Sequence, residues 1–83
     1  MAIEEKLRSY ILENYLFTDD ESALKNSDSF LEKGIIDSTG ILEVIYFIED
    51  EFDIKVDDEE MVPENLDSVN NIISFIEQKQ SAG

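Results

Sequence analysis

Ser38 is the residue of this 83-residue chain whose neighbours most clearly suggest chemistry. It follows Asp37 in the segment Gly34-Ile35-Ile36-Asp37-Ser38-Thr39-Gly40, where an apolar loop leads into a long acidic and apolar segment. A hydroxyl at such a junction can cap a helix, act as a nucleophile, or receive a group from another enzyme. Considered locally, the cap is the simplest interpretation, because an Asp or Ser at this position stabilises a helix by about 1 kcal/mol.

Self-contained catalysis by Ser38 is disfavoured by what the chain lacks. A serine nucleophile needs a base within hydrogen-bonding reach, and that base needs its own orienting partner. The sequence contains no histidine and no cysteine, and the nearest lysine, Lys33, stands among residues expected to be exposed. The full Gly-x-Ser-x-Gly pattern of a nucleophile elbow is also missing around Ser38, since position 36 is isoleucine. We therefore predict that the protein is not an enzyme.

The acidic stretch from Glu49 to Glu60 is the second feature with possible chemistry, as a calcium loop. An EF-hand requires alternating oxygen ligands, a central glycine and a terminal glutamate. The segment DEFDIKVDDEE at residues 50–60 has no glycine and places apolar residues between its acids. We therefore expect no specific metal site.

The overall charge restricts the partners. The chain carries 21 acidic and 6 basic residues, a formal net charge of −15. This charge repels nucleic acids and anionic membrane surfaces and suits proteins with basic patches. Residues 1–6 lack the basic and apolar regions of a signal peptide, and no apolar run approaches the length of a membrane span. We expect a cytoplasmic monomer with no stable membrane insertion and, without cysteine, no disulfide.

The spacing of apolar residues predicts the elements that must position Ser38. Residues 3–16 show helical periodicity. Residues 17–37 are rich in turn formers and predict a long loop with a short helical turn near residues 20–25. Apolar side chains along this loop are expected to pin it across the bundle: Leu24, Phe30, Leu31, Ile35 and Ile36.

Residues 38–52 contain many β-branched and aromatic residues, which also occur in buried strands. The capping candidates Asp37 and Ser38 and the separation of polar from apolar positions favour a helix. A short helix is predicted near residues 58–62, ended by Pro63. A final helix over residues 69–78 is capped at Asp67-Ser68, with residues 79–83 frayed.

The predicted fold class is all-α. We expect a small four-helix bundle with three main helices, one short helix and a long loop between the first two main helices. Residues 1–83 form a single domain in this interpretation, with a core over about residues 3–78.

The segment FLEKGIIDSTGILEVIYFIEDEF at residues 30–52 resembles the phosphopantetheine attachment region of the acyl carrier protein family. That region has an Asp-Ser pair after an apolar, glycine-containing loop, followed by an acidic helix that ends Glu-Glu-x-Phe. Ser38 corresponds to the attachment serine and Asp37 to the acid before it. Further positions also match: Phe30, Gly34, Glu43, Ile48, Glu49, Asp50 and Phe52. The order of predicted elements resembles the family over nearly the whole chain, so residues 1–83 would form one carrier domain.

The resemblance implies a function and a set of partners. A phosphopantetheinyl transferase would attach 4′-phosphopantetheine to Ser38, and an acyl- or aminoacyl-activating ligase would load the arm with a thioester. Synthases or acyltransferases with basic surfaces would then receive the cargo. Residues implied in partner recognition are Asp37, Thr39, Leu42, Glu43, Tyr46, Glu49 and Asp50. Residues implied in an acyl-chain pocket are Val44, Ile45, Ile48, Ile72 and Ile76.

Thr39 and Gly40 depart from the family pattern, because carriers of general fatty-acid synthesis usually have Leu-Asp after the serine. Gly40 also lowers helix propensity by roughly 1 kcal/mol relative to alanine. These differences favour a dedicated carrier in a specialised lipid or secondary-metabolite pathway, with the choice between fatty acyl and aminoacyl cargo left open. The alternative function is a small acidic helical adaptor that binds basic proteins without a covalent arm.

Overall fold

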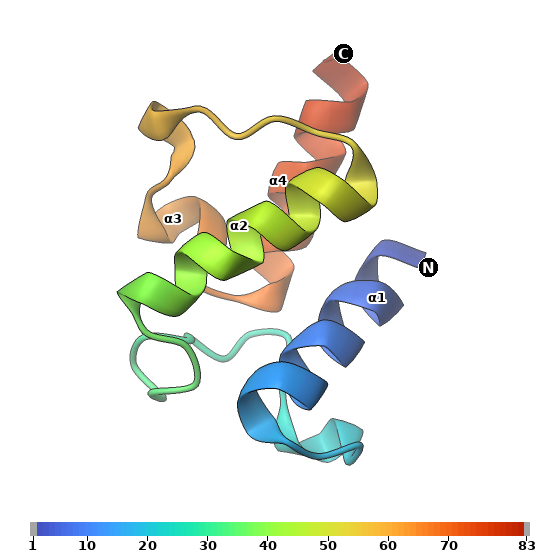
Figure 1. The fold of residues 1–83 in the computed structure, drawn as a ribbon, viewed down its shortest axis with the longest axis vertical. Helices are drawn as coiled ribbons and strands as arrows, with labels where there is room; N and C mark the ends of the chain where they lie inside the picture. Colours follow the sequence, from blue (N-terminus) through green and yellow to red (C-terminus); the bar gives the residue numbers. More distant parts are fainter. Residues whose placement is uncertain (1, 83) are drawn as a thin grey trace.

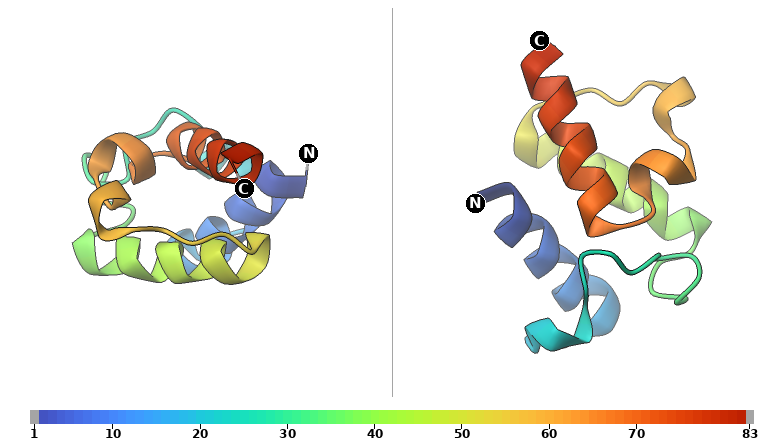
Figure 2. Two further views of the ribbon diagram at one scale, coloured as in Figure 1. Left: turned by 90° about the horizontal axis from the view of Figure 1, so that it is seen from above. Right: turned by 180° about the vertical axis from the view of Figure 1, so that it is seen from behind.

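The computed structural model describes residues 2–82, with side chains over residues 3–81. It is all-helical, with α1 at Ala2–Ile11, α2 at Ser38–Phe52, α3 at Pro63–Leu66 and α4 at Val69–Ala82. The predicted arrangement of three main helices, one short helix and a long first loop is confirmed (Figure 1). Seen from above, α2 and α4 lie on opposite sides of the molecule (Figure 2, left).

The first helix changes its hydrogen-bonding pattern before it ends. After Ile11 the chain continues through a π-helical turn at Leu12–Leu16, which ends at Phe17 in the left-handed conformation, with φ 54°. The Phe17 N–H donates to the Leu12 carbonyl, five residues back, as a π-turn requires. The predicted helix over residues 3–16 is therefore confirmed in extent, but its last five residues are not α-helical.

The long loop crosses the end of the bundle where α1 ends and α2 begins (Figure 1). Its short turn is a 3-10 helix at Glu21–Ala23, as the sequence predicts near residues 20–25. The Arg8 guanidinium holds this part of the loop, donating to Asn26 Oδ1 at 2.6 Å and to the Glu21 carbonyl at 2.7 Å. The Asn70 N–H donates to the Asn26 carbonyl at 3.0 Å, so the loop is also tied to α4.

Not all of the apolar loop residues are buried. Leu24, Phe30 and Ile36 are in the core, Ile35 is half-buried, and Leu31 is 44% exposed, so the prediction that Leu31 pins the loop is wrong. The reason is a tertiary contact: the Phe30 N–H donates to the Asp67 carbonyl and the Leu31 N–H to Asp67 Oδ1. With Phe30 directed inward, the adjacent Leu31 side chain is directed outward.

The segment after α2 corrects a second prediction. A 3-10 turn at Asp58–Glu60 is present, but Val62 is extended, with φ −122° and ψ 152°, and Pro63 begins α3 instead of ending a helix. Proline restricts the residue before it to extended conformations, and its fixed φ suits the first helical position, where no N–H is needed. The short fourth helix is therefore Pro63–Leu66.

The last helix is capped as predicted, because the Asn71 N–H donates to Ser68 Oγ at 3.1 Å. The predicted end near residue 78 is too early, since α4 continues to Ala82. Lys79 explains part of this extension: its ammonium lies 2.7 Å from Glu60 Oε1, a contact that joins the helix to the 58–60 turn. This hydrogen bond to Lys79 holds the pKa of Glu60 below its usual range. The predicted fraying of residues 79–83 stays a prediction, and Gly83 lies outside the described residues.

The buried apolar side chains form one cluster that joins the four helices and the loops. Its members are Leu7, Ile11, Leu12, Leu24, Phe30, Ile36, Val44, Ile45, Ile48, Val56, Leu66, Val69, Ile72, Phe75 and Ile76. None of the helices within residues 2–82 has the length and apolar character needed to cross a membrane.

Candidate functional site

At the start of α2, Asp37 caps the helix and Ser38 does not. Asp37 is extended and is the N-cap: its Oδ1 accepts the Gly40 N–H at 2.8 Å, and its carbonyl accepts the Ile41 N–H at 2.9 Å. Ser38 is the first helical residue and is exposed, and its hydroxyl has no hydrogen-bond partner among the described residues. The cap therefore does not require a serine at position 38.

A tight turn brings Asp37 and Ser38 to the surface. The Phe30 carbonyl accepts the Ile35 N–H at 2.9 Å and the Ile36 N–H at 3.4 Å, which closes the chain between them into a compact loop. Gly34 has a φ of +68°, a conformation that glycine adopts without steric cost. Ile36 is then buried, and the next two residues emerge at the helix start.

An apolar hollow of about 280 Å³ lies beside Ser38. It is bounded by the loop, by the first half of α2 and by the segment around α3. Its lining residues are Leu31, Ser38, Ile41, Leu42, Ile45, Met61, Val62, Pro63, Leu66 and Asp67. The exposed Leu31 thus forms part of a surface hollow next to the candidate attachment serine.

The five residues predicted to line an acyl-chain pocket lie apart from the hollow beside Ser38, with one exception. They do come together, but in the closed core, where each is at most 1% exposed: Val44, Ile45, Ile48, Ile72 and Ile76. Of these, only Ile45 also lines the hollow. The hollow is found toward α3, not between α2 and α4. Sequence reasoning missed Met61, Val62 and Leu66, whose apolar character beside Pro63 was the available signal.

The residues predicted to contact partners fall into two groups. Thr39, Leu42, Tyr46 and Asp50 are exposed on α2. The others are engaged within the chain: Asp37 caps the helix, Glu43 Oε1 accepts the Tyr15 hydroxyl at 2.7 Å, and Glu49 Oε2 accepts the Val56 N–H at 2.9 Å.

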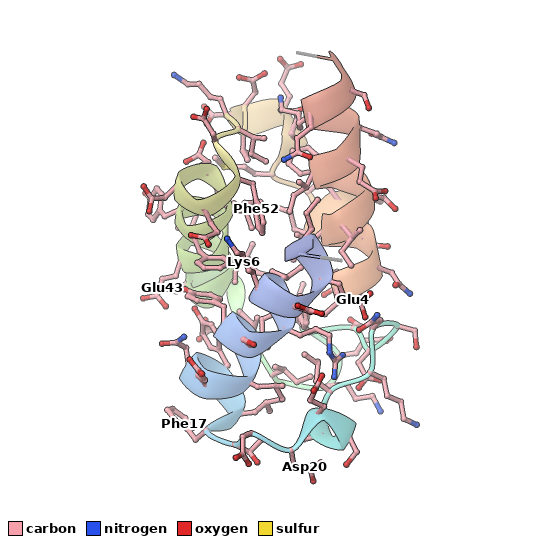
Figure 3. The ribbon with its side chains drawn as sticks, turned by 90° about the vertical axis from the view of Figure 1, so that its right-hand side faces the viewer. Glu4, Lys6, Phe17, Asp20, Glu43 and Phe52 are labelled. Carbon is pink, nitrogen blue, oxygen red and sulfur yellow. The ribbon has the colours of Figure 1, made fainter. Side chains whose placement is uncertain are left out.

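Glu49 is half-buried and fastens the chain that follows α2, so its role in partner recognition stays a prediction. Glu43 remains exposed at the side of α2 (Figure 3). Within residues 2–82, no three acidic side chains are grouped so that they would hold a metal ion.

Helix propensity does not explain why residue 40 is a glycine, but its packing does. Gly40 is buried, and a Cβ at this position would lie 2.6 Å from Ile36 Cγ2 and 3.2 Å from Tyr15 Cε1. Side chains in a close-packed core cannot give way freely to such a contact. Glycine at position 40 is therefore required by the close approach of the loop and of the end of α1 to the first turn of α2.

Gly40→Ala is expected to destabilise the protein although alanine is the better helix former. Overpacking costs about 1–3 kcal/mol, and the gain in helix propensity offsets about 1 kcal/mol, which leaves a net loss on the order of 1 kcal/mol. Urea unfolding measures this difference. The exposed Ser74→Ala in α4 is the control and should be neutral or slightly stabilising.

Ile36→Leu removes the branch that the new methyl group would meet, so Gly40→Ala should cost less in that background. A Gly40→Ala protein as stable as the unaltered chain would contradict the packing argument.

Comparison with curated proteins finds relatives of this chain. No family model matches this chain. A D-alanyl carrier protein of Streptococcus uberis is 35% identical over 82 residues, and the match covers 99% of this chain and 100% of that protein.

Proposed function

This chain belongs to the acyl carrier protein family, and we propose that it carries an aminoacyl group on a 4′-phosphopantetheine arm attached to Ser38. Proteins of this family are carriers and not catalysts, in agreement with the prediction from the sequence. The observation that carries the proposal is the exposed Ser38 hydroxyl, which is free of the capping role that Asp37 performs.

The surroundings of Ser38 suit such a group. The first N–H groups of a helix have no intrahelical partner and, together with the helix dipole, favour a phosphate. The Gly40 N–H is taken by Asp37, so the N–H groups of Ser38 and Thr39 would hold the phosphate. The apolar side chains of Leu31, Leu42 and Pro63 in the hollow would hold the rest of the group. When attached, it supplies a thiol that this cysteine-free chain lacks, and the cargo is held there as a thioester.

Two observations support a small aminoacyl cargo over a fatty chain. The relative in Streptococcus uberis is, by its name, a carrier of the D-alanyl group. The core between α2 and α4 is closed, since Val44, Ile48, Ile72 and Ile76 show no exposure. Opening a close-packed core would oppose the entry of a long chain. D-Alanine is therefore the first cargo to test.

The partners follow from this role: a phosphopantetheinyl transferase, an aminoacyl-activating ligase, and enzymes with basic surfaces that receive the cargo. Leu42, Tyr46 and Asp50 give α2 an exposed face of mixed apolar and acidic character. Charge attraction over a Debye length of about 8 Å accelerates encounter and permits quick release. Both properties suit a carrier that visits several enzymes in turn.

The cargo is tested by loading the phosphopantetheinylated protein with ATP, a D-alanine-activating ligase and D-alanine, and measuring the intact mass. A parallel reaction contains octanoate and a fatty-acid-activating ligase. We expect the D-alanyl protein to form readily and the octanoyl protein to form slowly or not at all. Efficient loading with octanoate and none with D-alanine would overturn the aminoacyl proposal while leaving the carrier function intact.

A further inference from the structure

Tyr15 links the end of α1 to the start of α2 across the outside of the candidate site. Its hydroxyl lies 2.7 Å from Glu43 Oε1 and 3.3 Å from the Gly40 carbonyl oxygen. A tyrosine hydroxyl has one proton, so it donates mainly to the nearer carboxylate and has the carbonyl as its second acceptor. One side chain of the π-helical turn that follows α1 thus contacts both the first turn of α2 and a carboxylate in its second turn.

The π-helical turn at Leu12–Leu16 gives Tyr15 its direction. A π-turn closes its hydrogen bonds over five residues where an α-turn uses four, so its side chains point differently from those of a continued α-helix. The ring is then held by its neighbours: Tyr15 packs edge-on against Tyr10 with centroids 5.9 Å apart, and Tyr10 stacks on Phe47 of α2 at 4.0 Å. Aromatic pairs at these distances are favourable.

Gly40 completes the contact, because the absence of a Cβ lets the Tyr15 ring approach the helix backbone. Burial, followed by the hydrogen bond to Glu43, raises the pKa of Tyr15 well above its usual value. Its hydroxyl therefore keeps its proton and remains a donor throughout the physiological range. Figure 3 shows Glu43 on α2 beside α1 and on the same side of the molecule as Phe17, which ends the π-turn.

We propose that Tyr15 is a positioning residue: it holds the first turns of α2, which carry Ser38, and fixes the Glu43 carboxylate in one orientation for a cationic group of the transferase. One Glu43 oxygen accepts the Tyr15 hydroxyl, which leaves the other oxygen available to a partner. Fixing this flexible side chain in advance reduces the entropy lost when a partner binds. This inference rests on the proposed function only for its second part, the contact with the transferase.

The first part is tested without any enzyme, by amide hydrogen exchange in the unaltered protein, in Tyr15→Phe and in Ser9→Ala. Tyr15→Phe keeps the ring and removes only the hydroxyl, while Ser9→Ala removes an exposed hydroxyl from α1, just before the π-helical turn. We expect the amides of residues 41–44 to exchange roughly two- to tenfold faster in Tyr15→Phe. The amides of residues 72–76 in α4 should be unchanged, and Ser9→Ala should match the unaltered protein. Unchanged exchange at residues 41–44, or equal acceleration in both helices, would overturn the positioning role.

The second part is tested by steady-state kinetics of phosphopantetheine transfer, with the protein as the varied substrate. Tyr15→Phe should raise KM roughly two- to tenfold with kcat unchanged. In a Glu43→Ala background, the same substitution should have little further effect on KM. An unchanged KM, or an equal loss with and without Glu43, would overturn the role of Tyr15 in orienting that carboxylate. If the unaltered chain is not modified at all, the proposed function fails, while the exchange experiment still decides whether Tyr15 holds α2.

Discussion

Ser38→Ala is expected to abolish the attachment of 4′-phosphopantetheine completely and to leave the fold unchanged. In the proposed transfer a bond forms between Ser38 Oγ and the pyrophosphate phosphorus of coenzyme A that bears the pantetheine group, the P–O bond to the other pyrophosphate phosphorus breaks, and adenosine 3′,5′-bisphosphate leaves. The serine proton must pass to a base, and this chain has no histidine to accept it. Without Oγ the new bond cannot form. The fold should persist because Asp37, and not Ser38, caps α2.

Intact mass after incubation with coenzyme A and a broad-specificity phosphopantetheinyl transferase measures this effect. The unaltered chain should gain one phosphopantetheinyl group, as should Ser74→Ala, which removes an exposed hydroxyl from the middle of α4. Modification of Ser38→Ala would place the attachment elsewhere. Failure of the unaltered chain with an active transferase would remove the main support for a phosphopantetheine-dependent role and favour the acidic adaptor.

Phe30→Ala is expected to unfold most of the protein, whereas Phe17→Ala should change its stability little. Phe30 is 0% exposed and Phe17 is 82% exposed, so the same substitution is compared in the core and at the surface. Removing a buried phenylalanine side chain costs about 3–5 kcal/mol, and a small domain with a single core has about 3–5 kcal/mol in total. The free energy of unfolding of Phe30→Ala should therefore fall nearly to zero.

Circular dichroism during urea unfolding measures both variants. The Phe30→Ala protein should also be a poor substrate for the transferase, because the buried Phe30 ring anchors the loop that leads to Asp37 and Ser38 in the core. If the free energy of unfolding of the Phe30→Ala protein is within about 1 kcal/mol of that of the unaltered chain, the loop must repack to fill the space left by the ring. Such complete repacking is rare after a large-to-small core substitution. Equal losses in both variants would show that Phe17 is not a surface residue in solution.

The sequence by itself determined the features that depend on neighbouring residues. The bounds of α2 at Ser38–Phe52 agree with prediction because a capping acid, an apolar stripe and a change of periodicity all occur within that segment. Ser68 as the cap of α4 and the short turn at Glu21–Ala23 are local in the same way. The net charge of −15 and the absence of histidine and cysteine limit the chemistry without reference to any fold.

Only the tertiary structure decided which of these residues are free and which are engaged. Tyr15 and Gly40 are 25 positions apart, so helix propensity could not show that a ring lies against this glycine. Asp67 holds the loop by accepting the Leu31 N–H from 36 positions away, and this contact directs Leu31 toward the hollow beside Ser38. Whether Pro63 ends one helix or begins another depends on the path of the chain before it, here the 3-10 turn at Asp58–Glu60 and the extended Val62. Contacts of this kind follow from packing the whole chain into one core, and the hollow beside Ser38 exists only once that packing is complete.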